Sequence, residues 1–116
     1  MANYDTGEMI VPRPDSIENL LIYLHECAHF VLHRDEEKSP IYTKEFQAET
    51  WAIDKIQMGG LSLPDELLLR SRRRTANEIR GALRNRIRRL DKRAVEFAWP
   101  CFDVFEQPTL RCATSP

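Results

Sequence analysis

The sequence predicts one small, mainly α-helical domain. Its 116 residues leave room for a single core, and 42% of them are apolar, which is enough to fill it. Apolar side chains recur three or four positions apart through much of the chain, which is the spacing of helices that bury one face. Only residues 7–12 have the composition of a short strand or one arm of a hairpin.

The first predicted helix covers residues 16–33. Asp15 and Glu18 have the spacing of a capping box, whose side chains satisfy the free N–H groups at a helix start. A charged loop that contains a proline is expected after it, at residues 34–42. The apolar positions that carry the helical interval are Ile17, Leu20, Leu21, Leu24, Ala28, Val31 and Leu32.

A second helix is predicted over residues 44–58. It ends at Gly59-Gly60, because glycine readily takes the left-handed conformation that closes helices. Its apolar stripe consists of Phe46, Ala52, Ile53 and Ile56.

A third, long helix is predicted over residues 64–98. Ser62 can cap it, Pro64 fits its first turn, and Pro100 stops it. A break near residues 71–74 is compatible with the pattern. The narrow apolar seam of this helix consists of Ala76, Ile79, Leu83, Ile87, Leu90 and Ala94.

These elements predict a single domain over residues 1–100 and an irregular tail over residues 101–116 that packs on it. Three scattered cysteines, Cys27, Cys101 and Cys112, form no CxxC pair and indicate free thiols. No apolar run approaches the roughly 20 residues of a membrane span, and the first residues lack the pattern of a signal peptide. We therefore expect a cytoplasmic protein without a membrane partner.

The first helix carries an HExxH sequence, from His25 to His29. Residues four apart share a helical face, so both imidazoles can reach one metal ion. Zinc lowers the pKa of a bound water to roughly 7. Glu26 lies beside the two histidines and can accept the proton of that water as a general base. The alternative is that both histidines are ordinary helix residues.

A catalytic zinc needs a third protein ligand, and the second helix offers two. Glu45 and Glu49 are four apart and share a face, so one can bind the metal while the other accepts a hydrogen bond from a ligand histidine. The alternative is that both are solvated charges. His33 lies about 80° round the helix from His25. We therefore expect it outside the metal ligands, as a helix C-terminal residue.

The two motifs together resemble a known family. "HECAHFVLH", which starts at His25, is followed by ExxAExxA, which starts at Glu45. This combination is similar to the ImmA/IrrE-type zincin-like metallopeptidases, especially the short members encoded by phages and prophages. The resemblance covers roughly residues 20–98, through "GGLSLP" and into the Arg-rich segment that ends "LDKRAVEFA".

The resemblance implies a minimal zincin-like domain with an active-site helix, a second ligand-bearing helix and a long Arg-rich helix. It implies that His25 and His29 bind zinc, that Glu26 is catalytic and that Glu45 is the acidic ligand. Glu49 falls where related proteins often carry Asp or Asn as a supporting group. Glutamate is longer than either, which leaves open whether Glu45 or Glu49 binds the metal; Glu45 is favoured.

The first functional expectation is therefore a zinc metallopeptidase that acts on an intracellular protein. By resemblance, that substrate is a regulator or repressor. A peptidase of this kind usually holds its substrate along the edge strand of a sheet, and only residues 7–12 are expected to form a strand. The alternative expectation is a zinc-stabilised module that regulates or antagonises a partner protein without cutting it.

A third expectation comes from charge. Residues 1–69 hold 13 acids and 5 bases, whereas residues 70–116 hold 5 acids and 12 bases. Residues 70–93 alone contain eleven Arg or Lys. Such a segment can bind the phosphates of a nucleic acid, or it can pair with an acidic protein or with the acidic half of the chain itself.

Overall fold

The computed structural model describes residues 2–3, 8–9, 15–33 and 39–114. In this part of the chain, five α-helices and one short 3-10 helix account for most of the structure, so the predicted mainly α class is confirmed. Contacts separate the chain into an N-terminal unit, residues 1–67, and a C-terminal unit, residues 68–116. Each unit is described by itself. Among the described residues, no helix is both long and apolar enough to cross a membrane.

Two very short strands precede the first helix. β1 (Ala2–Asn3) pairs antiparallel with β2 (Glu8–Met9), so that Ala2 lies opposite Met9. Of the strand predicted over residues 7–12, only β2 belongs to the described residues. The rest of that segment lies outside them.

Helix α1 (Ile17–Leu32) matches the first predicted helix to within one residue at each end. Its cap is Ser16, whose hydroxyl accepts the backbone N–H of Asn19 at 3.1 Å. Asp15 was expected to take part in the cap. Its carboxylate instead accepts a hydrogen bond from the side-chain amide of Asn19, at 2.8 Å. The start of the helix is thus fixed by a serine in the position where serine is commonly found.

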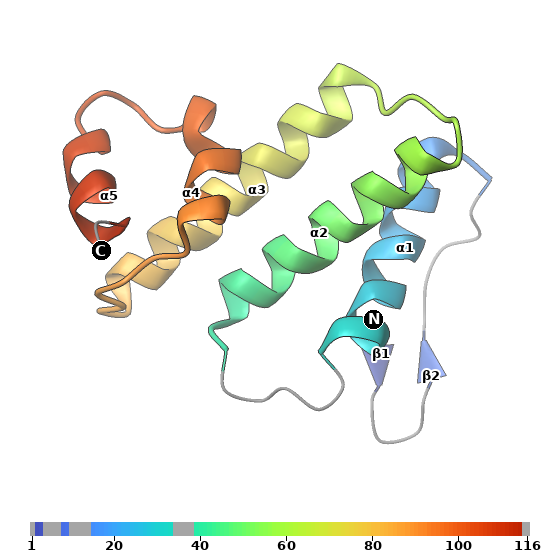
Figure 1. The fold of residues 1–116 in the computed structure, drawn as a ribbon, viewed down its shortest axis with the longest axis horizontal. Coiled ribbons are helices and arrows are strands. Elements are labelled where there is room, and N and C mark those ends of the chain that lie inside the picture. The colour runs from blue at the N-terminus through green and yellow to red at the C-terminus, as the bar shows by residue number, and fades with distance from the viewer. Residues whose placement is uncertain (1, 4–7, 10–14, 34–38, 115–116) are drawn as a thin grey trace. The chain divides into compact units, whose positions relative to one another are not determined.

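Helix α2 (Ile41–Met58) begins three residues before the predicted position, directly after Pro40. α1 and α2 pack along each other (Figure 1). Fully buried alanines lie on both helices, Ala28 on α1 and Ala48 and Ala52 on α2. Small side chains at these positions leave room for the helices to approach closely, which brings polar groups of one helix within reach of the other.

The C-terminal unit contains most of α3 (Asp65–Arg84), then α4 (Lys92–Ala98), the 3-10 helix η1 (Trp99–Cys101) and α5 (Gln107–Thr114). Figure 1 shows these elements in order along the chain. Its core is apolar and built from all three α-helices and the turns between them. The buried apolar residues are Ala76, Ile79, Ala82, Leu90, Ala94, Val95, Ala98, Phe102 and Leu110.

The prediction of a single long helix over residues 64–98 is wrong, because α3 ends at Arg84. The N–H of Arg86 donates to Leu83 O at 3.0 Å and that of Ile87 to Ala82 O at 3.1 Å, with Arg86 at a φ of 63°. This is the Schellman closure of a helix, which normally uses glycine at the position of Arg86. The helix continues without interruption through residues 71–74.

A new helix start follows the break. The carboxylate of Asp91 accepts the backbone N–H groups of Arg93 at 2.8 Å and Ala94 at 3.1 Å, and thereby caps α4. The N–H of Leu90 donates to Ala113 O at 3.1 Å and joins this turn to α5.

The tail, predicted to be irregular, contains α5. The carboxylate of Asp103 accepts the N–H groups of Phe105 and Glu106, both at 2.9 Å, just before the helix begins. The guanidinium of Arg80 on α3 donates to both carboxylate oxygens of Glu106, at 2.7 and 2.9 Å. Leu110 of α5 is almost fully buried. Local capping, an ion pair and apolar burial together order this segment.

Candidate metal centre

Two turns of α1 and the first turns of α2 form the candidate site. His25 and His29 lie one turn apart on α1 and are both buried, and Glu45 on α2 is half-buried. The HExxH spacing places both imidazoles on the face of α1 that packs on α2. The sequence thus brings three side chains together from two helices of the same unit.

The ligand atoms of these three residues converge. His25 Nε2 lies 2.7 Å from Glu45 Oε2, and His29 Nε2 lies 3.2 Å from Glu45 Oε1. The two Nε2 atoms are 3.2 Å apart. One ligand atom from each residue lies within 4.8 Å of the others, so the His25, His29 and Glu45 group could hold a metal ion.

Glu49 reaches His25 from the opposite side of the ring. The carboxylate accepts a hydrogen bond from His25 Nδ1 at 3.0 Å, and its side chain is buried. Glu49 therefore meets the nitrogen that points away from Glu45. This contact orients the imidazole and leaves Nε2 directed at the centre.

His29 has a corresponding contact that the sequence did not reveal. Its Nδ1 lies 3.2 Å from His33 Nδ1, and His33 Nε2 lies 2.7 Å from Gln47 Oε1. His33 terminates α1, as predicted, but it is only 3% exposed and takes part in this chain of hydrogen bonds. The four-residue spacing between His29 and His33 is compatible with this contact, whereas nothing in the sequence indicated Gln47.

The centre favours positive charge. Burial alone would lower the pKa of His25, but hydrogen bonds to Glu45 and Glu49 outweigh it and raise that pKa to about 9. Hydrogen bonds from His25 and His29 hold the pKa of Glu45 well below its usual range. A proton on His25 balances the carboxylates here, and a cation at the same place would compete with that proton.

Glu26, the residue expected to act as a base, lies on α1 directly after His25 and is half-buried. It is not one of the three converging groups. Cys27 is a half-buried free thiol and is likewise outside the group.

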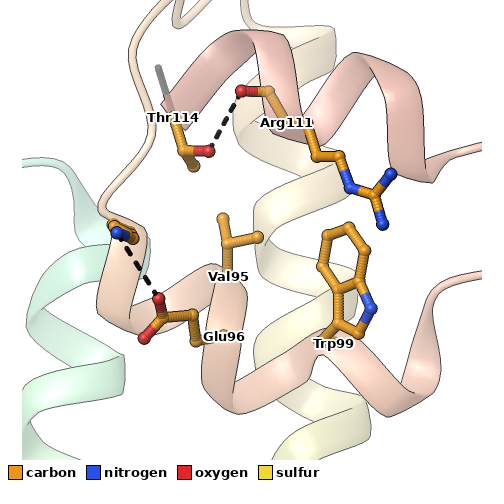
Figure 2. A pocket seen from close by; sticks show the side chains of 6 residues that line it. Val95, Glu96, Trp99, Arg111 and Thr114 are labelled. Carbon is orange, nitrogen blue, oxygen red and sulfur yellow. Dashed lines mark hydrogen bonds and ion pairs between the residues drawn. The ribbon is translucent and has the colours of Figure 1, made fainter. Parts of the chain in front are cut away.

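A separate hollow lies within the C-terminal unit, between α4 and α5 (Figure 2). It has a volume of about 440 Å³. The guanidinium of Arg111 lies over the ring of Trp99 at 5.3 Å, and Thr114 donates to Arg111 O at 3.2 Å. This hollow has an aromatic wall and no group of converging metal ligands among the described residues.

Comparison of the chain with protein-family models, with curated proteins and with solved structures found no match.

Proposed function

We propose that His25, His29 and Glu45 bind Zn²⁺ and that the protein is a zinc-dependent peptidase of the ImmA/IrrE type acting on a regulatory protein. The observation that carries this proposal is the convergence of two imidazole Nε2 atoms and one carboxylate on a single buried point. Two histidines and one glutamate form a ligand set that catalytic zinc uses, with a fourth position left for water or substrate. The donor set therefore fits the ion that the motif implies.

In the proposed reaction, each of the protein's own groups has one role. A zinc ion held here would supply a Lewis acid that activates water at neutral pH. Glu26 accepts a proton from water and passes it to the amine nitrogen as the peptide C–N bond breaks. Glu49 holds the ring of His25 through Nδ1, so that this ligand stays directed at the centre.

Metal content is the first test. The wild-type protein, purified without chelator, is expected to contain one zinc per chain, and His25→Ala/His29→Ala is expected to contain none. Thr50→Val serves as a control, because Thr50 lies on α2, the helix that carries Glu45, and its hydroxyl donates to the backbone carbonyls of Phe46 and Gln47. Wild-type metal content far below one per chain would overturn the proposal.

Glu26→Gln separates an enzyme from a non-catalytic zinc module. The variant should keep its zinc, since Glu26 is not among the converging ligands. It should lose cleavage of a peptide library, scored as new N-termini by mass spectrometry. Cleavage that persists in the variant at the wild-type rate removes Glu26 as the base. If wild type and variant both hold zinc and neither cleaves, the regulatory module is the better description.

A second candidate function rests on the turn between α3 and α4. Its cations are all exposed, and we call them the basic cluster: Arg84, Arg86, Arg88, Arg89, Lys92 and Arg93. Asp91, the one acidic residue within 84–93, is engaged in capping α4. By contrast, Arg80 is paired with Glu106, and Arg72 donates to Phe97 O within the unit. Arg72 and Arg80 thus have structural contacts, whereas the basic cluster is exposed.

The surroundings of the basic cluster favour a nucleic acid over a protein. Among the described residues, none of the large exposed apolar side chains lies within 84–93. Protein interfaces depend on aromatic and apolar anchors, whereas phosphate binding is largely electrostatic. We therefore propose phosphate-backbone binding as the second function.

Duplex DNA retention in rising salt tests this function. Binding should weaken steeply with salt, and Arg88→Ala/Arg89→Ala should reduce both the affinity and the salt slope. Arg73→Ala/Arg74→Ala removes the same charge from α3 outside the cluster and should have the smaller effect. Binding that is absent, or indifferent to salt, dismisses the second function.

A further inference from the structure

A chain of hydrogen bonds links α2 back to one of the candidate ligands through His33. Gln47 Oε1 lies 2.7 Å from His33 Nε2, and His33 Nδ1 lies 3.2 Å from His29 Nδ1. The three imidazoles of α1 succeed one another along the helix, with ring centroids 4.9 Å apart for His25 and His29 and 5.3 Å apart for His29 and His33.

The hydrogen bonds that join Gln47, His33 and His29 have a defined direction. An amide oxygen can only accept, so His33 Nε2 must carry the hydrogen that Gln47 receives. A neutral imidazole has a single N–H, so His33 Nδ1 is then an acceptor and receives the Nδ1–H of His29. A histidine that binds a metal is neutral, so His29 Nε2, which otherwise donates to Glu45, would then offer its lone pair at the point that faces His25 and Glu45.

We propose that His33 and Gln47 are positioning residues that hold His29 with its Nε2 lone pair directed at the metal position. The inference rests on the metal site proposed above and adds the groups that orient its second histidine. Glu49 does the same for His25 through Nδ1. Each imidazole is thus oriented by an acceptor that meets its outer nitrogen.

The burial of His33 argues that this contact is more than helix packing. His33 is 3% exposed, and an apolar side chain would fill such a place at the end of α1 without the cost of burying polar nitrogens. Both of its nitrogens have partners, one on each helix. Reversal of the hydrogen-bond chain would place a hydrogen on His29 Nε2 and block its lone pair, so the acceptor character of Gln47 Oε1 has a direct consequence for the ligand.

Paired substitutions at His33 separate orientation from packing. Asn and Leu have nearly the same shape, and the Asn oxygen can occupy the place of the His33 Nδ1 acceptor, whereas Leu has no acceptor. Zinc affinity is measured by competition with a chromophoric chelator, and thermal stability is measured on the metal-free proteins. His33→Leu should weaken zinc binding about 10–100-fold, the usual effect of losing such a partner. His33→Asn should retain most of the affinity, although burying an amide makes it the less stable of the two.

Gln47→Met provides an independent variant at a half-buried position, so it decides the matter if the His33 variants fail to fold. It should weaken zinc binding about 10-fold, while Thr50→Val on the same helix leaves the affinity unchanged. Equal losses in His33→Asn and His33→Leu, or wild-type affinity in His33→Leu and Gln47→Met, would overturn the inference. Failure of the wild-type protein to bind zinc at all would instead overturn the proposed metal site.

Discussion

Glu45 and Glu49 lie one turn apart on α2, yet they meet opposite nitrogens of His25. Glu45 lies 2.7 Å from Nε2, and Glu49 lies 3.0 Å from Nδ1. Glu45 also approaches His29, with its Oε1 3.2 Å from His29 Nε2. The sequence could identify both carboxylates as candidates for the metal site, because residues four apart lie on the same face of a helix. It could not assign their roles, which depend on how far α2 is rotated against α1.

The two glutamates make a matched pair for mutation. Glu45→Gln should weaken zinc binding by more than 100-fold, because it replaces a negatively charged carboxylate ligand with a neutral amide. Glu49→Gln should weaken it only about 10-fold, because an amide oxygen can still accept from His25 Nδ1. Both changes remove one negative charge from the same helix, so the comparison isolates the contact. Competition with a chromophoric chelator measures both, and the reverse order of effects would exchange the two roles.

Two helix ends show which element boundaries the sequence could predict. At the end of α2, Gly60 has a φ of 83° and its N–H donates to Gln57 O at 3.0 Å. The end of α3 has the same bonding pattern, with Arg86 in the equivalent place. Gly60 indicated the end of α2 in the sequence. Arg86 did not indicate the end of α3, because arginine ordinarily indicates that a helix continues.

The conformation of Arg86 leads to a stability prediction. Arg86→Val should lower the free energy of unfolding by about 1–2 kcal/mol, because a left-handed conformation is costly for a side chain branched at Cβ. Arg86→Gly should not lower it, since glycine takes this conformation without strain. Urea unfolding followed by Trp99 fluorescence in a Trp51→Phe background measures the change in the C-terminal unit. Equal stability of the two variants would contradict the prediction.

The ion pair that attaches the start of α5 to α3 predicts a response to acid. Hydrogen bonds from Arg80 lower the pKa of Glu106 to about 2, below the ordinary value of 4.5. The folded state therefore binds the proton more weakly than the unfolded state does. The stabilising contribution is complete above about pH 4.5 and is lost as the pH falls toward 2. Arg80 and Glu106 are partly exposed, so screening reduces its size.

Glu106→Gln should therefore flatten the acid dependence of unfolding in that pH range. The same Trp99 fluorescence measured from pH 5 to pH 2 would show it, with Glu96→Gln as the control. Glu96 is an exposed residue whose contact with Lys92 is long, at 3.9 Å. Identical pH profiles for wild type and Glu106→Gln would show that the pair contributes nothing to acid stability.

At the scale of the whole molecule, charge divides where the contacts divide. The boundary between the two units falls at residues 67 and 68, and the same point separates 13 acids and 5 bases from 5 acids and 12 bases. The charge imbalance is read directly from the sequence, whereas the assignment of residues 1–100 to one domain stays a prediction. All three candidate metal ligands lie in the acidic unit, and the basic cluster lies in the other.

This division predicts that the two proposed functions can be removed separately. Arg88→Ala/Arg89→Ala should leave zinc affinity within the error of the chelator assay. His25→Ala/His29→Ala should leave salt-dependent retention on DNA unchanged. Each effect belongs to a different unit, and sites that share no partners ordinarily act additively. Loss of DNA retention in the histidine variant would show that the functions are coupled.

The ligand spacing along the chain has one more consequence. His29 and Glu45 belong to different helices and are separated by a connection that passes through residues 34–38. A cation held by both would act as a reversible crosslink, tying α1 to α2 as a disulfide would. Such a crosslink would raise the free energy of unfolding as the free ion concentration rises. The gain would be about 2.7 kcal/mol at an ion concentration one hundred times the dissociation constant. The durability of this fold would then be set in part by the metal supply around it.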